Sequence, residues 1–126
     1  MIQKMNNKCV NFYNYLGRFF GSRIVYFTTK DRIYDDNDKD WYIYTDKYDH
    51  VTSFLSISKN KIKNVYSTNT DDLKTLLDAV LKVEKIVPST VTKIYLDIYK
   101  KCGMNISSGN QKNFVNIWSK EKWVKK

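Results

Sequence analysis

Residues 51–67, VTSFLSISKNKIKNVYS, decide the fold, because they have the pattern of a β-hairpin. In the first half, Val51, Ser53, Leu55 and Ile57 alternate with polar or smaller neighbours, as on a half-buried strand. Lys59 and Asn60 supply a two-residue turn, and residues 61–67 return beside the first strand. Two cross-strand pairs, which set the register, are expected with this turn: Ile57 with Ile62, and Phe54 with Val65.

Three further elements are expected before this hairpin. Residues 41–45, WYIYT, and residues 23–29, RIVYFTT, are aromatic and β-branched, which predicts a strand in each. The acidic segment 31–40 separates them as a loop. Residues 9–20 carry apolar side chains at helical spacing and end near two glycines, so they predict an N-terminal helix.

The first element expected after the hairpin is an amphipathic helix. Thr70 is a candidate N-cap, acidic residues fill the first turn, and lysines lie in the last, each favourable to the helix dipole. Its apolar stripe consists of Leu73, Leu76, Leu77, Val80, Leu81 and Val87.

A second helix is expected from Pro88 to Cys102, with Gly103 at the position that ends it. Residues 107–126 favour a third helix, although Phe114–Trp118 also suits a strand. This order of elements predicts a single α+β domain over residues 1–126. Its mainly antiparallel sheet would have three to four strands, with the N-terminal helix and two or three C-terminal helices against one face.

The composition is unusual in its lysine content. The formal net charge is +9, and Lys outnumbers Arg 19 to 3. Lys, Asn, Ile and Tyr, whose codons are rich in A and T, are the favoured residues, which indicates an AT-rich genome such as that of a virus, phage or mobile element. Codon bias therefore explains part of the charge, which would otherwise indicate nucleic acid or an anionic membrane as the partner.

The expected location is the cytoplasm, or the host cytoplasm if the protein is viral. No apolar stretch has the length of a secretory signal core or a membrane-spanning helix, so no membrane partner is expected. Cys9 and Cys102 are far apart and belong to no paired motif, which fits a reducing compartment.

Motifs for catalysis are scarce, and we expect neither enzymatic activity nor a cofactor. The one histidine, His50, has no nucleophile tied to it by spacing. Asp36, Asp38 and Asp40 have the opening spacing of a calcium loop, but the glycine that the turn requires is replaced by Trp41, so no metal is expected. A nuclease that uses Asp36 and Asp38 is the third-ranked hypothesis.

Positive charge is concentrated toward the carboxyl end. Residues 51–126 hold fourteen basic and six acidic residues, whereas residues 1–50 hold eight and seven. Lysines that neutralise phosphates, beside tryptophans that stack on bases, are typical of a nucleic-acid surface. The basic and aromatic residues of this segment are Lys100, Lys101, Lys112, Trp118, Lys120, Lys122, Trp123, Lys125 and Lys126.

Residues 94–118 resemble a helix-turn-helix in outline. Asn110, Gln111, Lys112 and Asn113 would then lie near the start of the recognition helix, where Asn and Gln pair with adenine. Two packed antiparallel helices would have the same pattern.

The sheet offers a second candidate surface. Tyr42 and Tyr44 share one face of their strand, and Lys61 and Lys63 share one face of the hairpin. Exposed tyrosines beside lysines suit stacking on unpaired bases, or contact with a protein.

The leading hypothesis is a small, basic, non-enzymatic accessory protein of a virus, phage or mobile element that binds DNA or RNA. The alternative is a protein-binding module: an inhibitor or adaptor of a host defence factor, or a small subunit of a larger complex. The sequence leaves the choice between DNA and RNA and the oligomeric state open.

Overall fold

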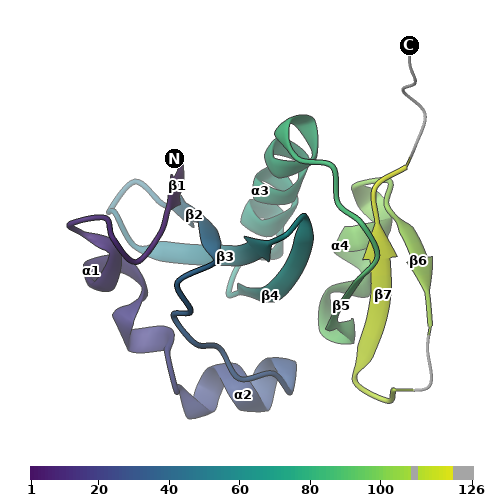
Figure 1. Ribbon diagram of the computed structural model, residues 1–126, viewed down its shortest axis with the longest axis horizontal. Helices are drawn as coiled ribbons and strands as arrows, with labels where there is room; N and C mark the ends of the chain where they lie inside the picture. Colours follow the sequence, from purple (N-terminus) through teal and green to yellow (C-terminus); the bar gives the residue numbers. More distant parts are fainter. Residues whose placement is uncertain (109–110, 121–126) are drawn as a thin grey trace.

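A computed structural model describes residues 1–108 and 111–120, which form two antiparallel sheets side by side (Figure 1). The first sheet has the order β1-β2-β3-β4: Ile2–Met5, Asp40–Thr45, Val51–Ser58 and Lys61–Ser67. The second has the order β5-β7-β6: Ser89–Thr92, Phe114–Trp118 and Asn105–Ser107. The helices are α1 Phe12–Leu16, η1 Gly17–Phe19, α2 Arg23–Thr29, α3 Thr70–Val83, η2 Lys93–Tyr95 and α4 Leu96–Lys101. The expected α+β class is confirmed.

The predicted hairpin is β3 and β4. Lys59 and Asn60 both have left-handed φ values, 53° and 64°, as the expected two-residue turn requires, and Ile57 pairs with Ile62. Beyond that pair the register shifts by one residue, because β4 has a bulge. The expected pairing of Phe54 with Val65 is therefore wrong, since Phe54 faces Tyr66.

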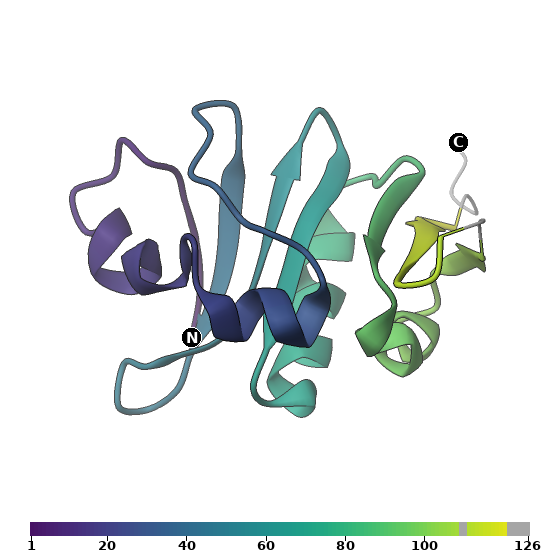
Figure 2. The same cartoon turned by 90° about the horizontal axis from the view of Figure 1, so that it is seen from below.

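Both faces of the first sheet are covered, whereas helices were expected against one face only. In β2, Trp41 and Ile43 join the core on the side of α1, and Tyr42 joins the core on the side of α3. Figure 2 shows α2 in front of the sheet and α3 behind it. The unbroken apolar run of β2 is the sequence feature of a strand that is buried on both faces.

Residues 23–29 form α2, so the predicted strand is wrong. The Ser22 hydroxyl accepts a hydrogen bond from the backbone N–H of Val25 at 3.3 Å, which caps the helix. Val25 and Thr29, four residues apart, are both buried. Burial at helical spacing outweighs the strand propensity of these residues.

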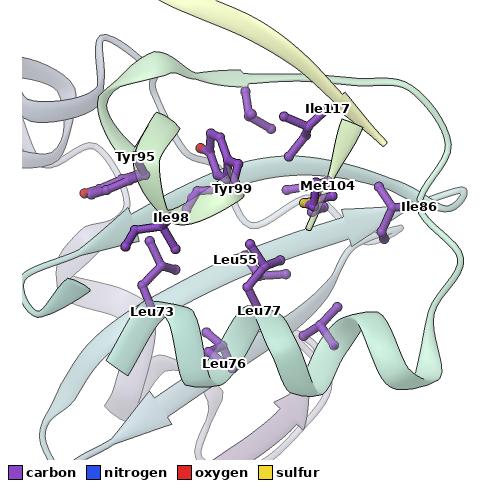
Figure 3. Close-up of a cluster of buried hydrophobic side chains, with 14 of the residues drawn as sticks. Leu55, Leu73, Leu76, Leu77, Ile86, Tyr95, Ile98, Tyr99, Met104 and Ile117 are labelled. Atoms are coloured by element: carbon purple, nitrogen blue, oxygen red, sulfur yellow. The ribbon is translucent and has the colours of Figure 1, made fainter. Parts of the chain in front are cut away.

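Helix α3 confirms the predicted amphipathic helix, but its cap lies one residue earlier than expected and it ends at Val83, so Val87 of the predicted stripe lies outside it. The Asn69 side chain accepts hydrogen bonds from the backbone N–H groups of Asp71 and Asp72. Four side chains of the predicted stripe are almost completely buried in one core: Leu73, Leu76, Leu77 and Val80. Figure 3 labels the first three, with Leu73 pointing toward Ile98 of α4.

The second predicted helix is correct only in its last turns. Residues 89–92 form β5, and the helical part begins at Lys93. Gly103 ends α4 with a φ of 78°, as expected. Its N–H donates to the Lys100 carbonyl and that of Met104 donates to the Tyr99 carbonyl, which is the Schellman arrangement.

The favoured C-terminal helix is wrong, and the alternative strand at residues 114–118 is right. This strand, β7, pairs with β5 and β6, so the second helix of a helix-turn-helix is missing from the described residues. The strand β1 near the N-terminus was not expected either, because its polar residues lack a clear alternating pattern.

Candidate functional site

Three lysines from separate elements surround one open groove of about 410 Å³. Lys30 ends α2, Lys93 begins η2, and Lys112 precedes β7. We call this site the lysine groove; its lining residues are Phe27, Thr28, Thr29, Lys30, Thr92, Lys93, Ile94, Lys112 and Asn113. In the described chain, none of these residues is acidic and none of the three lysines forms an ion pair.

Backbone contacts fix two walls of the lysine groove relative to each other. The N–H of Lys93 donates to the carbonyl of Asn113 at 2.9 Å, which joins the start of η2 to the start of β7. The Thr92 hydroxyl accepts from the N–H of Ile94 at 3.4 Å, which caps η2. Lys93 and Lys112 are therefore held beside each other by the main chain.

The third wall is the C-terminal end of α2. The N–H of Lys30, in a left-handed conformation, donates to the Tyr26 carbonyl at 2.6 Å. Because Val25 and Thr29 face the core, the outward face of α2 presents Ile24 and Phe27, which are 70% and 65% exposed. An exposed aromatic ring thus lies within the basic groove.

The structure keeps part of the predicted site together. Gln111, Lys112 and Asn113 are exposed as expected, but on the connection between β6 and β7 and not on a recognition helix. Lys112 and Asn113 line the lysine groove. The predicted residues Asn110, Lys122, Trp123 and Lys125 lie outside the described residues.

Lys120 is not part of this groove. It lines a larger cavity of about 520 Å³ with Lys82 and Lys85, but Glu84 lines the same cavity. Trp118 is half-buried. The expected single surface of C-terminal lysines is therefore divided between two places on the molecule, and only one of the two cavities has a purely basic set of charged side chains.

The predicted stacking surface at Tyr42 and Tyr44 is wrong. Tyr42 is 6% exposed, because α3 covers that face of β2, and Tyr44 is half-buried against the same core. The Tyr42 hydroxyl donates to a carboxylate oxygen of Glu84 at 2.6 Å. Burial, with the charge of Glu84, raises the pKa of Tyr42 above its ordinary value.

Lys61 and Lys63 are exposed on β4, on either side of buried Ile62. They lie apart from the tyrosines of β2, so the expected tyrosine–lysine patch does not form. However, β4 lies beside β5, where the N–H of Ile62 donates to the Ser89 hydroxyl at 3.0 Å. These lysines therefore flank the second sheet.

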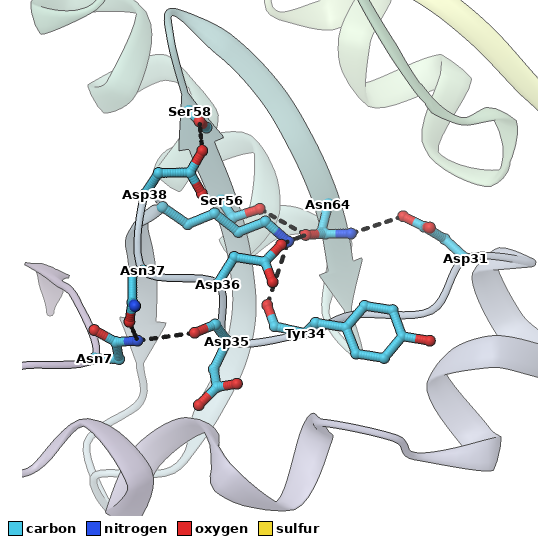
Figure 4. A network of polar contacts seen from close by, with 11 residues as sticks. Asn7, Asp31, Tyr34, Asp35, Asp36, Asn37, Asp38, Ser56, Ser58 and Asn64 are labelled. Carbon is cyan, nitrogen blue, oxygen red and sulfur yellow. Dashed lines mark hydrogen bonds and ion pairs between the residues drawn. The ribbon is translucent and has the colours of Figure 1, made fainter.

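The carboxylates of the acidic segment have separate partners (Figure 4). Asp31 accepts from the Asn64 amide at 2.9 Å, and Asp38 accepts from the Ser58 hydroxyl at 3.0 Å. Asp36 lies 3.4 Å from the ammonium of Lys39. Within residues 1–108 and 111–120, no group of three or more His, Cys, Asp or Glu side chains is arranged to hold a metal ion.

His50 lies in an exposed loop, with Nδ1 4.0 Å from a carboxylate oxygen of Asp46.

No helix in the described part of the chain has the length and apolar character needed to cross a bilayer.

Lys30, Lys93 and Phe27 line the groove but were not among the predicted site residues. The available signal was Ser22, a good N-cap followed by buried positions four residues apart, which would have placed Phe27 and Lys30 on a helix.

Comparison with protein families, curated proteins and solved structures finds no match to the chain.

Proposed function

We propose that this protein is a small, non-enzymatic accessory protein of a virus, phage or mobile element that binds nucleic acid through the lysine groove. The observation that carries the proposal is the convergence of Lys30, Lys93 and Lys112 with no acidic lining residue in the described chain. Like charges placed together without carboxylates suit a polyanion, because each ammonium neutralises a phosphate and releases a counterion.

The proposed binding combines charge with an aromatic contact. Phe27 and Asn113 line the same groove, so a base or sugar has an apolar ring and an amide beside the phosphate contacts. Lys is a point charge without the planar fork of Arg, so these contacts position a backbone and do not read sequence. The proposed binding is therefore weakly selective for sequence.

The experiment is fluorescence anisotropy with labelled DNA and RNA between about 50 and 200 mM salt. Three phosphate contacts predict a slope of about −2 to −3 for the logarithm of the binding constant against the logarithm of salt concentration. The triple variant Lys30→Ala, Lys93→Ala, Lys112→Ala is expected to remove most of this slope and to lose binding.

The matched control is Lys8→Ala, Lys47→Ala, Lys82→Ala, which changes the net charge equally at exposed positions outside the groove. If both triple variants weaken binding equally, the net charge is responsible and not the groove. No binding at about 50 mM salt would reject the proposal.

The outward face of α2 favours a second candidate function, which is docking to a protein. Ile24 and Phe27, one turn apart, are exposed apolar side chains, and Ile94 beside them is 54% exposed. Such a face suits an inhibitor or adaptor of a host factor, or a subunit of a larger complex. It predicts a stoichiometric partner that survives nuclease treatment and is lost in the Ile24→Asp, Phe27→Asp variant.

A further inference from the structure

The second sheet has one face in the core, and the side chains of its other face are mostly half-buried or exposed. In β7, Val115 and Ile117 are 2% and 0% exposed and belong to the core that includes α3. Phe114, Asn116 and Trp118 alternate with them, so they share the opposite face. We call this opposite face the open face of the second sheet.

Residues from both neighbouring strands extend the open face. Thr90 of β5 pairs with Asn116, and its hydroxyl donates to the Asn116 amide oxygen at 2.8 Å. Asn105 and Ser107 of β6 pair with Trp118 and Asn116. None of these three strands contains an acidic residue, so the open face is aromatic and polar without negative charge.

The open face continues into the lysine groove. Thr92, which pairs with Phe114, also lines the groove, and Asn113 and Lys112 directly precede Phe114 in the chain. On the other side of β5 lies β4, in which Lys61 and Lys63 are exposed. The aromatic strand thus has groove lysines at its Phe114 end, and a strand with two exposed lysines lies beyond β5.

We propose that the open face binds a single-stranded nucleic acid, whose unpaired bases stack on Phe114 and Trp118 while its backbone lies in the lysine groove. Aromatic side chains on the open face of a small antiparallel sheet stack bases in this way, with Asn and Thr available for hydrogen bonds to base edges. The two rings are roughly 14 Å apart along the strand, so they contact different bases. The inference rests on the proposed function and adds the strandedness of the ligand.

The test uses the fluorescence of Trp118. In the variant Trp123→Phe, the remaining tryptophans are Trp118 and Trp41, and Trp41 is completely buried, which leaves Trp118 as the accessible reporter. The probes are a 12-nucleotide oligo(dT), a 12-nucleotide oligo(rU) and a 12-base-pair DNA duplex. Emission is expected to fall on addition of a single strand and to change little with the duplex.

Two further variants in this background measure the contribution of the rings by the anisotropy titration, because Trp118→Leu removes the fluorescent reporter. Trp118→Leu and Phe114→Leu keep an apolar side chain but remove stacking, and circular dichroism checks their fold. Each is expected to weaken single-strand binding by between about 5-fold and 150-fold, and to leave duplex binding unchanged.

The outcomes separate this inference from the proposed function. If the lysine triple variant loses binding but Trp118 is not quenched and the leucine variants bind normally, the open face is not used, and the groove proposal stands. If neither single strand nor duplex binds at low salt, both proposals fail. If oligonucleotides leave the emission of Trp118 unchanged but a protein partner that stays bound after nuclease treatment quenches it, the open face is a protein surface. The inference is then overturned.

Discussion

At the scale of single residues, the amide of Asn64 holds the acidic segment to the first sheet. Its oxygen accepts hydrogen bonds from the Lys39 ammonium at 3.1 Å and the Ser56 hydroxyl at 2.7 Å, and its nitrogen donates to Asp31. Lys39 is 8% exposed, and its ammonium also lies near Asp36. A buried ammonium without such partners would be costly, so these contacts explain how a loop rich in carboxylates packs closely.

Asp31 makes stability depend on pH. Burial raises the pKa of Asp31 above its ordinary value, and this outweighs the lowering by Asn64 and Lys39. The folded protein therefore holds the proton more tightly than the unfolded chain, and the contribution of this carboxyl to stability falls as the pH rises through its folded pKa. An asparagine at this position cannot ionise in this way. The difference in free energy of unfolding, Asp31→Asn minus wild type, is therefore expected to rise between about pH 3 and pH 7.

Urea denaturation of both proteins at a series of pH values measures this difference. A difference that is independent of pH would show that Asp31 has the same pKa in the folded and unfolded states.

At the scale of elements, α2 shows how a helix forms from residues that favour strands. Its seven residues include four that are β-branched and two that are aromatic, and its stability depends on the Ser22 cap and on the burial of Val25 and Thr29. The helix ends where Lys30 adopts a φ of 63°, a conformation that glycine adopts more easily. The same residue contributes a positive charge to the lysine groove. A single side chain therefore affects both the strain at the end of α2 and the proposed binding.

Lys30→Gly is expected to change stability and binding in opposite directions. Relief of the left-handed strain raises the free energy of unfolding by up to about 1 kcal/mol, while the loss of one ammonium weakens nucleic-acid binding. The two measurements are urea denaturation and the anisotropy titration. Lys112→Gly, outside the left-handed region, is the control, and it is expected to weaken binding without a gain in stability.

At the scale of the whole molecule, two sheets share one core. The core on the α3 side contains Leu55 and Ile62 from the first sheet together with Val91 and Ile117 from the second. Figure 3 labels Leu55 and Ile117 in this core. At the junction, the Ser89 hydroxyl accepts from the N–H of Ile62, and the Asn60 carbonyl accepts from the N–H of Val87. The second sheet therefore depends on the first for its packing.

The shared core predicts one cooperative unfolding transition. Circular dichroism and tryptophan fluorescence are expected to give the same urea midpoint, since Trp41 and Trp118 report on different sheets. Ser89→Ala is expected to lower the free energy of unfolding by about 1–3 kcal/mol, because it leaves the buried N–H of Ile62 without its partner.

The matched control is Thr90→Ala. This neighbouring hydroxyl bonds only at the surface, so its removal is expected to cost less than Ser89→Ala. For the unfolding of the wild type, different urea midpoints by circular dichroism and by tryptophan fluorescence would mean that the sheets unfold independently.

The candidate site was predictable only in part. Lys112 was identified from the lysines concentrated toward the carboxyl end and Asn113 from its place in the helix-turn-helix outline, and both line the groove. Phe27 and Lys30 were not, because residues 23–29 were assigned to a strand, and Lys93 was not, because the sequence does not show that η2 lies beside the start of β7. Tyr42 was placed on a free surface because its alternation with Trp41 does not show that a helix covers each face of the sheet.

The sequence by itself determined the elements whose signals are local: the hairpin, whose turn residues Lys59 and Asn60 set the first pair, and α3, whose apolar stripe repeats at helical spacing. The tertiary structure decided the identity of α2, β5 and β7. These segments are short and rich in β-branched and aromatic residues, so their intrinsic preferences are weak and partners distant in the sequence choose between helix and strand. The lysine groove joins residues 30, 93 and 112, and only that long-range packing brings their charges together.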